Sequence, residues 1–145
     1  MKFLKALLPA VRVKSIQQFI NLLKTHGASN VLAQCTMKVQ DRVNLGSIGA
    51  TGRFLYVLVL NARGSDGRRL TTAIEVARRD GSERGFADHE ERSRSNTIAY
   101  LETERITDLL KKAGFDVQLF APDGNPFPDE VWSGIHADAS RLGLI

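Results

Sequence analysis

The regular hydrophobic pattern of the chain begins at residue 15, where the spacing predicts a helix over residues 15–26. Ser15 followed three positions later by Gln18 is the capping-box pattern that opens helices, and Gly27 can end this one. Apolar residues recur between these signals every three or four positions, which places them on one face of a helix: Ile16, Phe19, Ile20 and Leu23.

Three stretches have the pattern of β-strands. Residues 30–41 alternate between apolar and polar positions, as in a strand with one face on a core. Residues 53–62 and 70–77 are almost entirely apolar, which is typical of central strands covered on both faces. Residues 63–68, with the turn-forming sequence RGSDGR, are predicted to join these two strands as a hairpin, whereas the glycine-rich residues 41–53 are predicted to form a loop.

The second half of the chain adds a polar connection, two helices and a strand. Residues 78–96 hold five arginines and five acidic residues and are predicted to form a loop, of a length at which loops tend to be functional. A helix over residues 97–112, a strand over residues 115–120 and a last helix opened by Pro128 follow.

Together these elements predict an α/β protein in which a mixed central sheet of about four strands is flanked by helices, in the order α-β-β-β-α-β-α. The 145 residues suit a single domain, 1–145. Its core is expected over about residues 15–121, with a C-terminal turn and helix over residues 122–145.

Several chemistries find no support in the composition. The single cysteine, Cys35, lies on the apolar side of its predicted strand and is expected to pack rather than to react. The three histidines are scattered without the spacing of a zinc site. No stretch approaches the ~20 apolar residues of a membrane span, so a cytoplasmic protein with no membrane contact is expected.

The charge is distributed unevenly along the chain. Residues 1–72 hold 11 Lys and Arg residues and two acidic residues, whereas residues 73–145 hold nine and 14, although the net charge is only +4. A basic half favours a polyanion such as DNA. A chance distribution, or a protein partner for the acidic C-terminal half, is the alternative. The candidates for phosphate contact are Lys38, Arg53, Arg63, Arg68, Arg69, Arg78 and Arg79.

Two glutamates lie among apolar residues. Glu75 is in the middle of its predicted strand, and Glu102 falls within the apolar stripe of the second helix. Burying a carboxylate costs free energy unless a cation or a metal compensates for it. Two roles are therefore open for each. Either they are catalytic carboxylates, with Glu75 as a metal ligand or general base, or they form structural ion pairs, Glu75 with Arg78 or Arg105 and Glu102 with Arg105.

The order of elements resembles that of the restriction-endonuclease-like PD-(D/E)xK nucleases. Ala73-Ile74-Glu75 in a strand, followed by the helix and strand of residues 104–120, is similar to the very-short-patch-repair-endonuclease branch, and the resemblance spans about residues 15–140. In these nucleases a strand aspartate and an E-x-K pair hold Mg²⁺ beside the scissile phosphate. The resemblance implies that Glu75 is the glutamate of this motif.

The motif is degenerate in this chain. Ala77 stands in place of the lysine, and the preceding strand, residues 54–60, contains no aspartate. A single carboxylate would hold Mg²⁺ poorly, although Glu102 could replace a missing ligand. The resemblance therefore implies a bacterial DNA-binding protein without catalysis or cofactor, acting in DNA processing or on a plasmid or other mobile element. One alternative is an active Mg²⁺-dependent endonuclease using Glu75 and Glu102, with Asp66 or Asp80 as a further candidate ligand. The other is a protein-interaction module.

Overall fold

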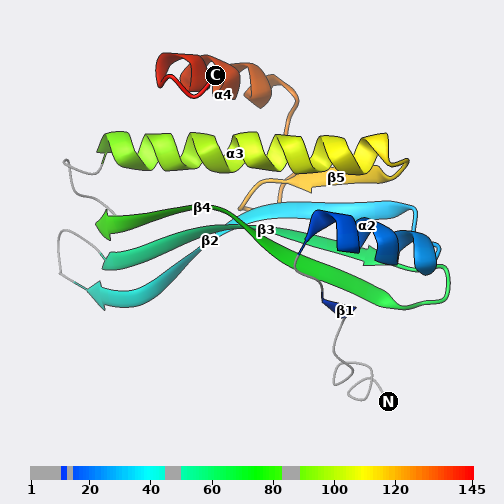
Figure 1. The fold of residues 1–145 in the computed structure, drawn as a ribbon. Coiled ribbons are helices and arrows are strands. Elements are labelled where there is room, and N and C mark those ends of the chain that lie inside the picture. Colours follow the sequence, from blue (N-terminus) through cyan, green and yellow to red (C-terminus); the bar gives the residue numbers. More distant parts are fainter. Residues whose placement is uncertain (1–10, 13–14, 45–49, 83–88) are drawn as a thin grey trace.

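The computed structural model describes residues 11–12, 15–44, 50–82 and 89–145 (Figure 1). The elements in this part of the chain are β1 (Val11–Arg12), α2 (Ile16–Thr25), β2 (Asn30–Asn44), β3 (Ala50–Arg63), β4 (Arg69–Ser82), α3 (His89–Lys112), β5 (Asp116–Phe120) and α4 (Glu130–Arg141). The predicted order α-β-β-β-α-β-α is confirmed for the longer elements, and the two-residue β1 precedes it. The predicted α/β class is confirmed as well.

The strands form one mixed sheet in the order β1-β4-β3-β2-β5. β2, β3 and β4 follow one another as antiparallel neighbours, and each is 14 or 15 residues long. After α3 the chain returns as β5, which lies parallel to β2 at one edge. At the other edge β1 lies parallel to β4. The sheet is thus a long, twisted three-stranded meander with a short parallel strand on each side (Figure 1).

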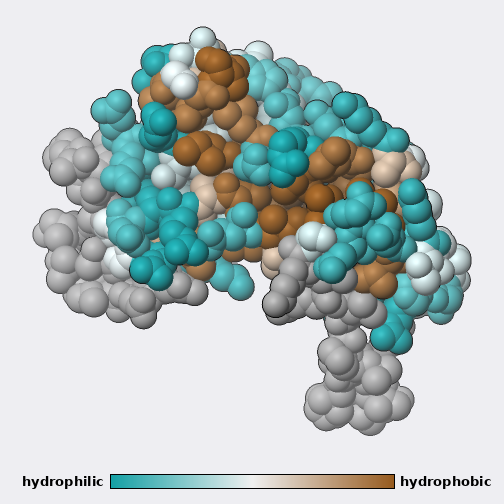
Figure 2. Space-filling model, in the orientation of Figure 1, coloured by the Kyte–Doolittle hydropathy of each residue, from teal (hydrophilic) through white to brown (hydrophobic). Residues whose placement is uncertain are grey.

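The helices form layers on one side of this sheet. α2 and α3 pack on the same face, and α4 lies on the outer side of α3 (Figure 1). In Figure 2 hydrophobic residues gather across the middle of the visible face, between α4 and α2. The largest fully buried apolar side chains come from both the helices and the strands: Phe19, Leu23, Phe54, Leu58, Leu60, Leu70, Ile106 and Leu110.

The opposite face of the sheet is covered by no helix in the described part of the chain. Strand alternation and register direct one set of side chains from β2, β3 and β4 to this side, which we call the open face: Leu32, Gln34, Thr36, Lys38, Arg53, Leu55, Val57, Val59, Asn61, Arg63, Arg69, Thr71, Ala73, Glu75, Arg78 and Asp80. The prediction that residues 53–62 and 70–77 are covered on both faces is therefore wrong for the described residues. The outward apolar side chains on β3 are nevertheless buried or half-buried.

The strands run further than their sequence patterns predict. β2 continues to Asn44 and β3 begins at Ala50, which takes both ends of the predicted loop 41–53 into the sheet. β4 continues to Ser82 and α3 begins at His89, so most of the predicted loop 78–96 is also regular structure. A long antiparallel neighbour supplies hydrogen bonds and cross-strand charge pairs to these polar segments, which outweigh their weak strand propensity.

A β-bulge interrupts the pairing of β3 with β4. Tyr56 lies opposite Ala77 and Val57 lies opposite Glu75, so Val76 is the extra residue on β4. Beyond the bulge, each residue of β4 points to the face opposite to the one that strict alternation assigns it. Two residues three positions apart across the bulge therefore share a face of the sheet.

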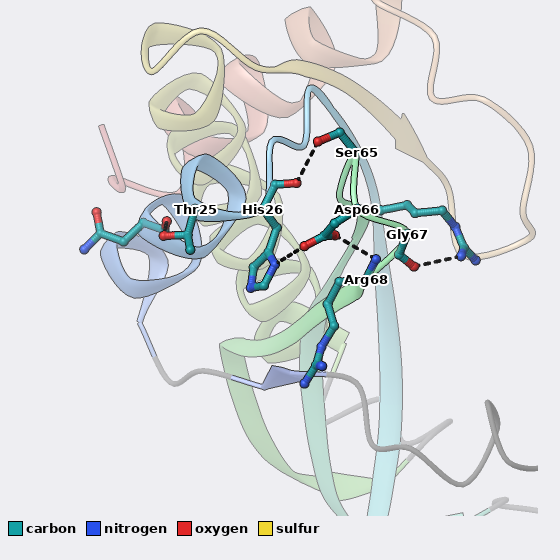
Figure 3. A network of polar contacts seen from close by, with 8 residues as sticks. Thr25, His26, Ser65, Asp66, Gly67 and Arg68 are labelled. Atoms are coloured by element: carbon teal, nitrogen blue, oxygen red, sulfur yellow. Dashed lines mark hydrogen bonds and ion pairs between the residues drawn. The ribbon is translucent and has the colours of Figure 1, made fainter.

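The C-terminus of α2 is tied to the turn between β3 and β4 (Figure 3). His26 Nδ1 lies 2.7 Å from Asp66 Oδ2, and Asp66 Oδ1 accepts a hydrogen bond of 2.9 Å from the backbone N–H of Arg68. The backbone N–H of Ser65 donates to the His26 carbonyl oxygen at 2.8 Å. A Cβ atom at Gly64 would lie 2.6 Å from that same oxygen, so this close approach requires glycine.

Candidate nucleic-acid interface

Five of the seven cations predicted to contact phosphates lie on the open face. They come from three neighbouring strands: Lys38 from β2, Arg53 and Arg63 from β3, and Arg69 and Arg78 from β4. All five side chains are exposed. Lys38, Leu55 and Arg78 form one row across the sheet, and Arg63 and Arg69 lie directly opposite each other beside the hairpin turn. The meander thus gathers cations that are far apart in the sequence onto one surface.

Two of these cations are paired with carboxylates of the same face. Arg78 Nη2 lies 3.0 Å from Glu75 Oε1, and Arg53 Nε lies 3.3 Å from Asp80 Oδ1. All four side chains are between 42% and 72% exposed. Exposed pairs of this kind contribute at most about 1 kcal/mol. They can therefore exchange the carboxylate for a phosphate at low cost.

The other three cations have no carboxylate partner among the described residues. Lys38 and Arg69 make no side-chain hydrogen bond or ion pair in this part of the chain. Arg63 donates from Nη1 to the Gly67 carbonyl oxygen at 3.2 Å, which holds its guanidinium near the turn. An excess of positive charge therefore remains on the open face after its internal pairs are formed.

The remaining two predicted phosphate contacts lie elsewhere. Arg68 is exposed on the hairpin turn, at the end of the open face. Arg79 is only 4% exposed and lies on the covered face. Its guanidinium carbon is 4.1 Å from the centre of the Phe54 ring, and its Nε donates to Tyr56 Oη at 3.3 Å. Arg79 therefore has a structural position and is not part of the open face.

The two candidate catalytic glutamates do not converge. Glu75 points to the open face, where Arg78 binds it, so of its two predicted partners Arg78 is the correct one. Glu102 lies in the helical layer on the other side of the sheet and accepts hydrogen bonds from Arg105, with Nη2 3.0 Å from Oε2. These bonds raise the pKa of Arg105. The predicted structural pairs are thus present for both glutamates.

The described part of the chain contains no set of side chains that could bind a metal ion. There, no group of three or more His, Cys, Asp and Glu side chains is arranged to hold a metal ion. Ser65, His26 and Asp66 are neighbours, but Ser65 Oγ donates to the His26 carbonyl oxygen rather than to the ring, at 3.3 Å. The serine is therefore not paired with a base. Cys35 is buried, and burial raises the pKa of its thiol, as fits its predicted packing role.

A hollow of about 440 Å³ lies on the sheet beside the hairpin turn. It is lined by Asn30, Leu32, Asn61, Ala62, Arg63, Arg69 and Leu70. Sequence reasoning selected the two arginines and missed Asn30, Leu32 and Asn61. A signal for Leu32 was present, because it is an apolar residue at a position that shares its face with the polar residues of strand 30–41. The hollow therefore combines cations, amides and one exposed apolar side chain.

No protein-family model matches this chain, and it has no match among curated proteins or solved structures. In the described residues, no helix combines the length and the apolar character that crossing a membrane requires.

Proposed function

We propose that the protein binds nucleic acid along the open face and does not cleave it. The observation that carries this proposal is the gathering of Lys38, Arg53, Arg63, Arg69 and Arg78, from three strands, on one face without a helical cover in the described part of the chain. Cations on one surface attract a polyanion and steer its approach. DNA, which the uneven charge of the sequence also favours, is the proposed partner.

The dimensions of the face suit an extended polyanion. Arg53 and Arg63 are ten positions apart on β3, which corresponds to roughly 33 Å along a strand. Phosphates of one strand of duplex DNA recur about every 3.4 Å along the helix axis. The cations thus cover a length of roughly ten base pairs, with Lys38 and Arg78 between the two ends.

The proposal that the protein does not cleave nucleic acid rests on the ion pair of Glu75 and on the missing lysine. Its carboxylate is held by Arg78, and Ala77 stands two residues further on, where the resemblance would require lysine. The second candidate, Glu102, is engaged by Arg105 on the other side of the sheet. We propose a restriction-endonuclease-like scaffold with a degenerate motif, acting in DNA processing or on a mobile element, on the strength of the sequence resemblance.

The proposal is tested by titrating the protein against a labelled DNA duplex at about 50 mM and 200 mM salt. The affinity should fall with salt, with a logarithmic slope of about −0.9 for each phosphate contact. The variant Lys38→Gln/Arg63→Gln/Arg69→Gln should weaken binding at least tenfold and reduce the slope by up to about three units. Mg²⁺ should produce no cleavage.

The matched control removes three exposed lysines from the helical layer: Lys24→Gln/Lys111→Gln/Lys112→Gln. It lowers the net charge by the same amount but leaves the open face intact, so its affinity should stay close to that of the unaltered protein. Absence of binding at low salt would contradict the proposal. So would equal weakening by the two triple variants, because the effect would then follow net charge and not the open face.

A further inference from the structure

Arg63 and Arg69 form an unfavourable cross-strand pair. The register of β3 and β4 places them directly opposite each other, and both point to the open face. Like charges in this position destabilise a sheet. Neither guanidinium has a carboxylate partner among the described residues. There, Arg63 Nη1 donates to the Gly67 carbonyl oxygen, and the Arg69 side chain makes no hydrogen bond. An anion bound between the two side chains would remove this repulsion.

The hollow beside this pair offers more than positive charge. Asn30 and Asn61 contribute amide groups that can both donate and accept hydrogen bonds, and neither has a side-chain partner in the described part of the chain. Leu32 is 45% exposed, an apolar surface between the polar groups. The volume of about 440 Å³ lies within the range of small-ligand sites. A ligand that combines an anion, a flat apolar surface and hydrogen-bonding edges would satisfy all of these groups.

We infer that this hollow receives one unpaired nucleotide of a nucleic-acid strand. Its phosphate lies between Arg63 and Arg69, its base lies over Leu32, and its edge faces the two asparagines. The inference rests on the proposed function and adds a preference for single strands. A base in a duplex is stacked and its pairing edge is occupied, so it cannot enter such a site without being extruded from the helix.

Three labelled probes separate the contributions of base and phosphate. They are a single-stranded oligonucleotide of about 12 nucleotides, the duplex of the same sequence, and an abasic oligonucleotide with the same number of phosphates. The unaltered protein should bind the single strand about tenfold more tightly than the abasic probe, because base contacts are lost. It should bind the duplex less tightly than the single strand as well.

Two variants locate these contacts. Leu32→Ser should remove most of the difference between the single-stranded and abasic probes, whereas Arg69→Gln should weaken both. The control Leu55→Ser makes the same chemical change on the open face outside the hollow and should keep the difference. Circular dichroism of each variant checks that the fold is retained.

The outcomes distinguish this inference from the proposed function. Equal affinity for the abasic and single-stranded probes, or tighter binding of the duplex, would overturn the nucleotide site and leave nucleic-acid binding intact. Equal effects of Leu32→Ser and Leu55→Ser would overturn the location of the base. Failure of the protein to bind any of the three probes at low salt would overturn the proposed function and the inference together.

Discussion

At the scale of single residues, two consecutive arginines have opposite environments. Arg78 lies exposed beside Glu75, whereas Arg79 is buried against Phe54 and Tyr56. The aromatic ring and the phenol oxygen partly compensate for the loss of water around the buried guanidinium. The sequence alone presents both as charged residues at the end of a strand and gives no means of separating them.

The two arginines should therefore differ in their contribution to stability. Arg79→Ala should lower the free energy of unfolding by about 2–3 kcal/mol, because it removes a desolvated cation–π contact and a buried hydrogen bond. Arg78→Ala should change it by no more than about 1 kcal/mol, the usual contribution of an exposed ion pair. Urea unfolding of both variants measures the difference. Equal losses would show that Arg79 is not the buried member of the pair.

The pairing of Glu75 could be predicted from its sequence only in part. The choice between a metal site and a structural pair was open, and Arg78 was one of two suggested partners. Strict alternation along β4 would put Glu75 and Arg78 on opposite faces, and only the bulge at Val76 brings them together. A bulge depends on the register of the neighbouring strand, which has no local signal in these residues.

At the scale of elements, the boundaries of α2 follow local chemistry closely, whereas α3 begins at His89, eight positions before the predicted start at residue 97. Ser15 Oγ accepts the backbone N–H of Gln18 at 3.2 Å at the start of α2, and Gly27 follows its end with a φ of 65°. The contact between this helix and the hairpin turn was not predicted, because His26 and Asp66 are 40 residues apart. A pair so far apart in the sequence meets only in the folded chain and has no local signal. A helix cap, in contrast, is formed within a few residues and can be predicted from them.

The contact between His26 and Asp66 should make the stability of the fold depend on pH in the acid range. The hydrogen bond from His26, together with that from the backbone of Arg68, lowers the pKa of Asp66 from its ordinary value of 3.8. A carboxyl group with a lowered pKa stabilises the fold above its ordinary pKa, and this stabilisation is lost as the pH falls through the lowered value. Asp66→Asn should therefore lower the melting temperature at pH 5, and the difference should shrink below pH 4.

A matched substitution tests whether this pH dependence arises from the contact between His26 and Asp66. Asp116→Asn removes an exposed aspartate whose side chain has no partner among the described residues. Its melting temperature should follow that of the unaltered protein across the same pH range. A constant difference between Asp66→Asn and the unaltered protein from pH 5 to pH 3 would contradict the assigned role of the carboxylate.

At the scale of the whole molecule, the apolar strands led to the wrong prediction that both faces of the sheet are covered. A strand with apolar residues at every position is typical of a sheet covered on both faces, and residues 54–60 have this composition. In the structure Leu58 points into the core, whereas Val57 and Val59 point to the open face. These outward valines are buried or half-buried although no helix of the described residues covers them, so the composition of one strand cannot reveal that a layer is missing.

Substitutions at neighbouring positions of β3 should differ in their effect on stability, because helices cover only one face of the sheet in the described part of the chain. Leu58→Ala should lower the free energy of unfolding by about 2–5 kcal/mol, as expected for a cavity in a packed core. Val59→Ala, on the open face, should cost about 1 kcal/mol or less, because water can replace the lost methyl groups. Chemical denaturation of the two variants measures both values. Comparable losses would indicate a further layer over the open face.

The bulge at Val76 has a further consequence for the outer edge of β4. β1 pairs only with Leu70 and Thr71, so the remainder of this edge has no strand partner in the described part of the chain. A long, regular edge strand can recruit the same strand of another molecule and start aggregation. The bulge breaks the even spacing of N–H and C=O groups on this edge, and charged residues follow it. The same inserted residue that sets the faces of β4 therefore also makes this edge a poorer template for pairing with a second copy than a regular strand edge would be.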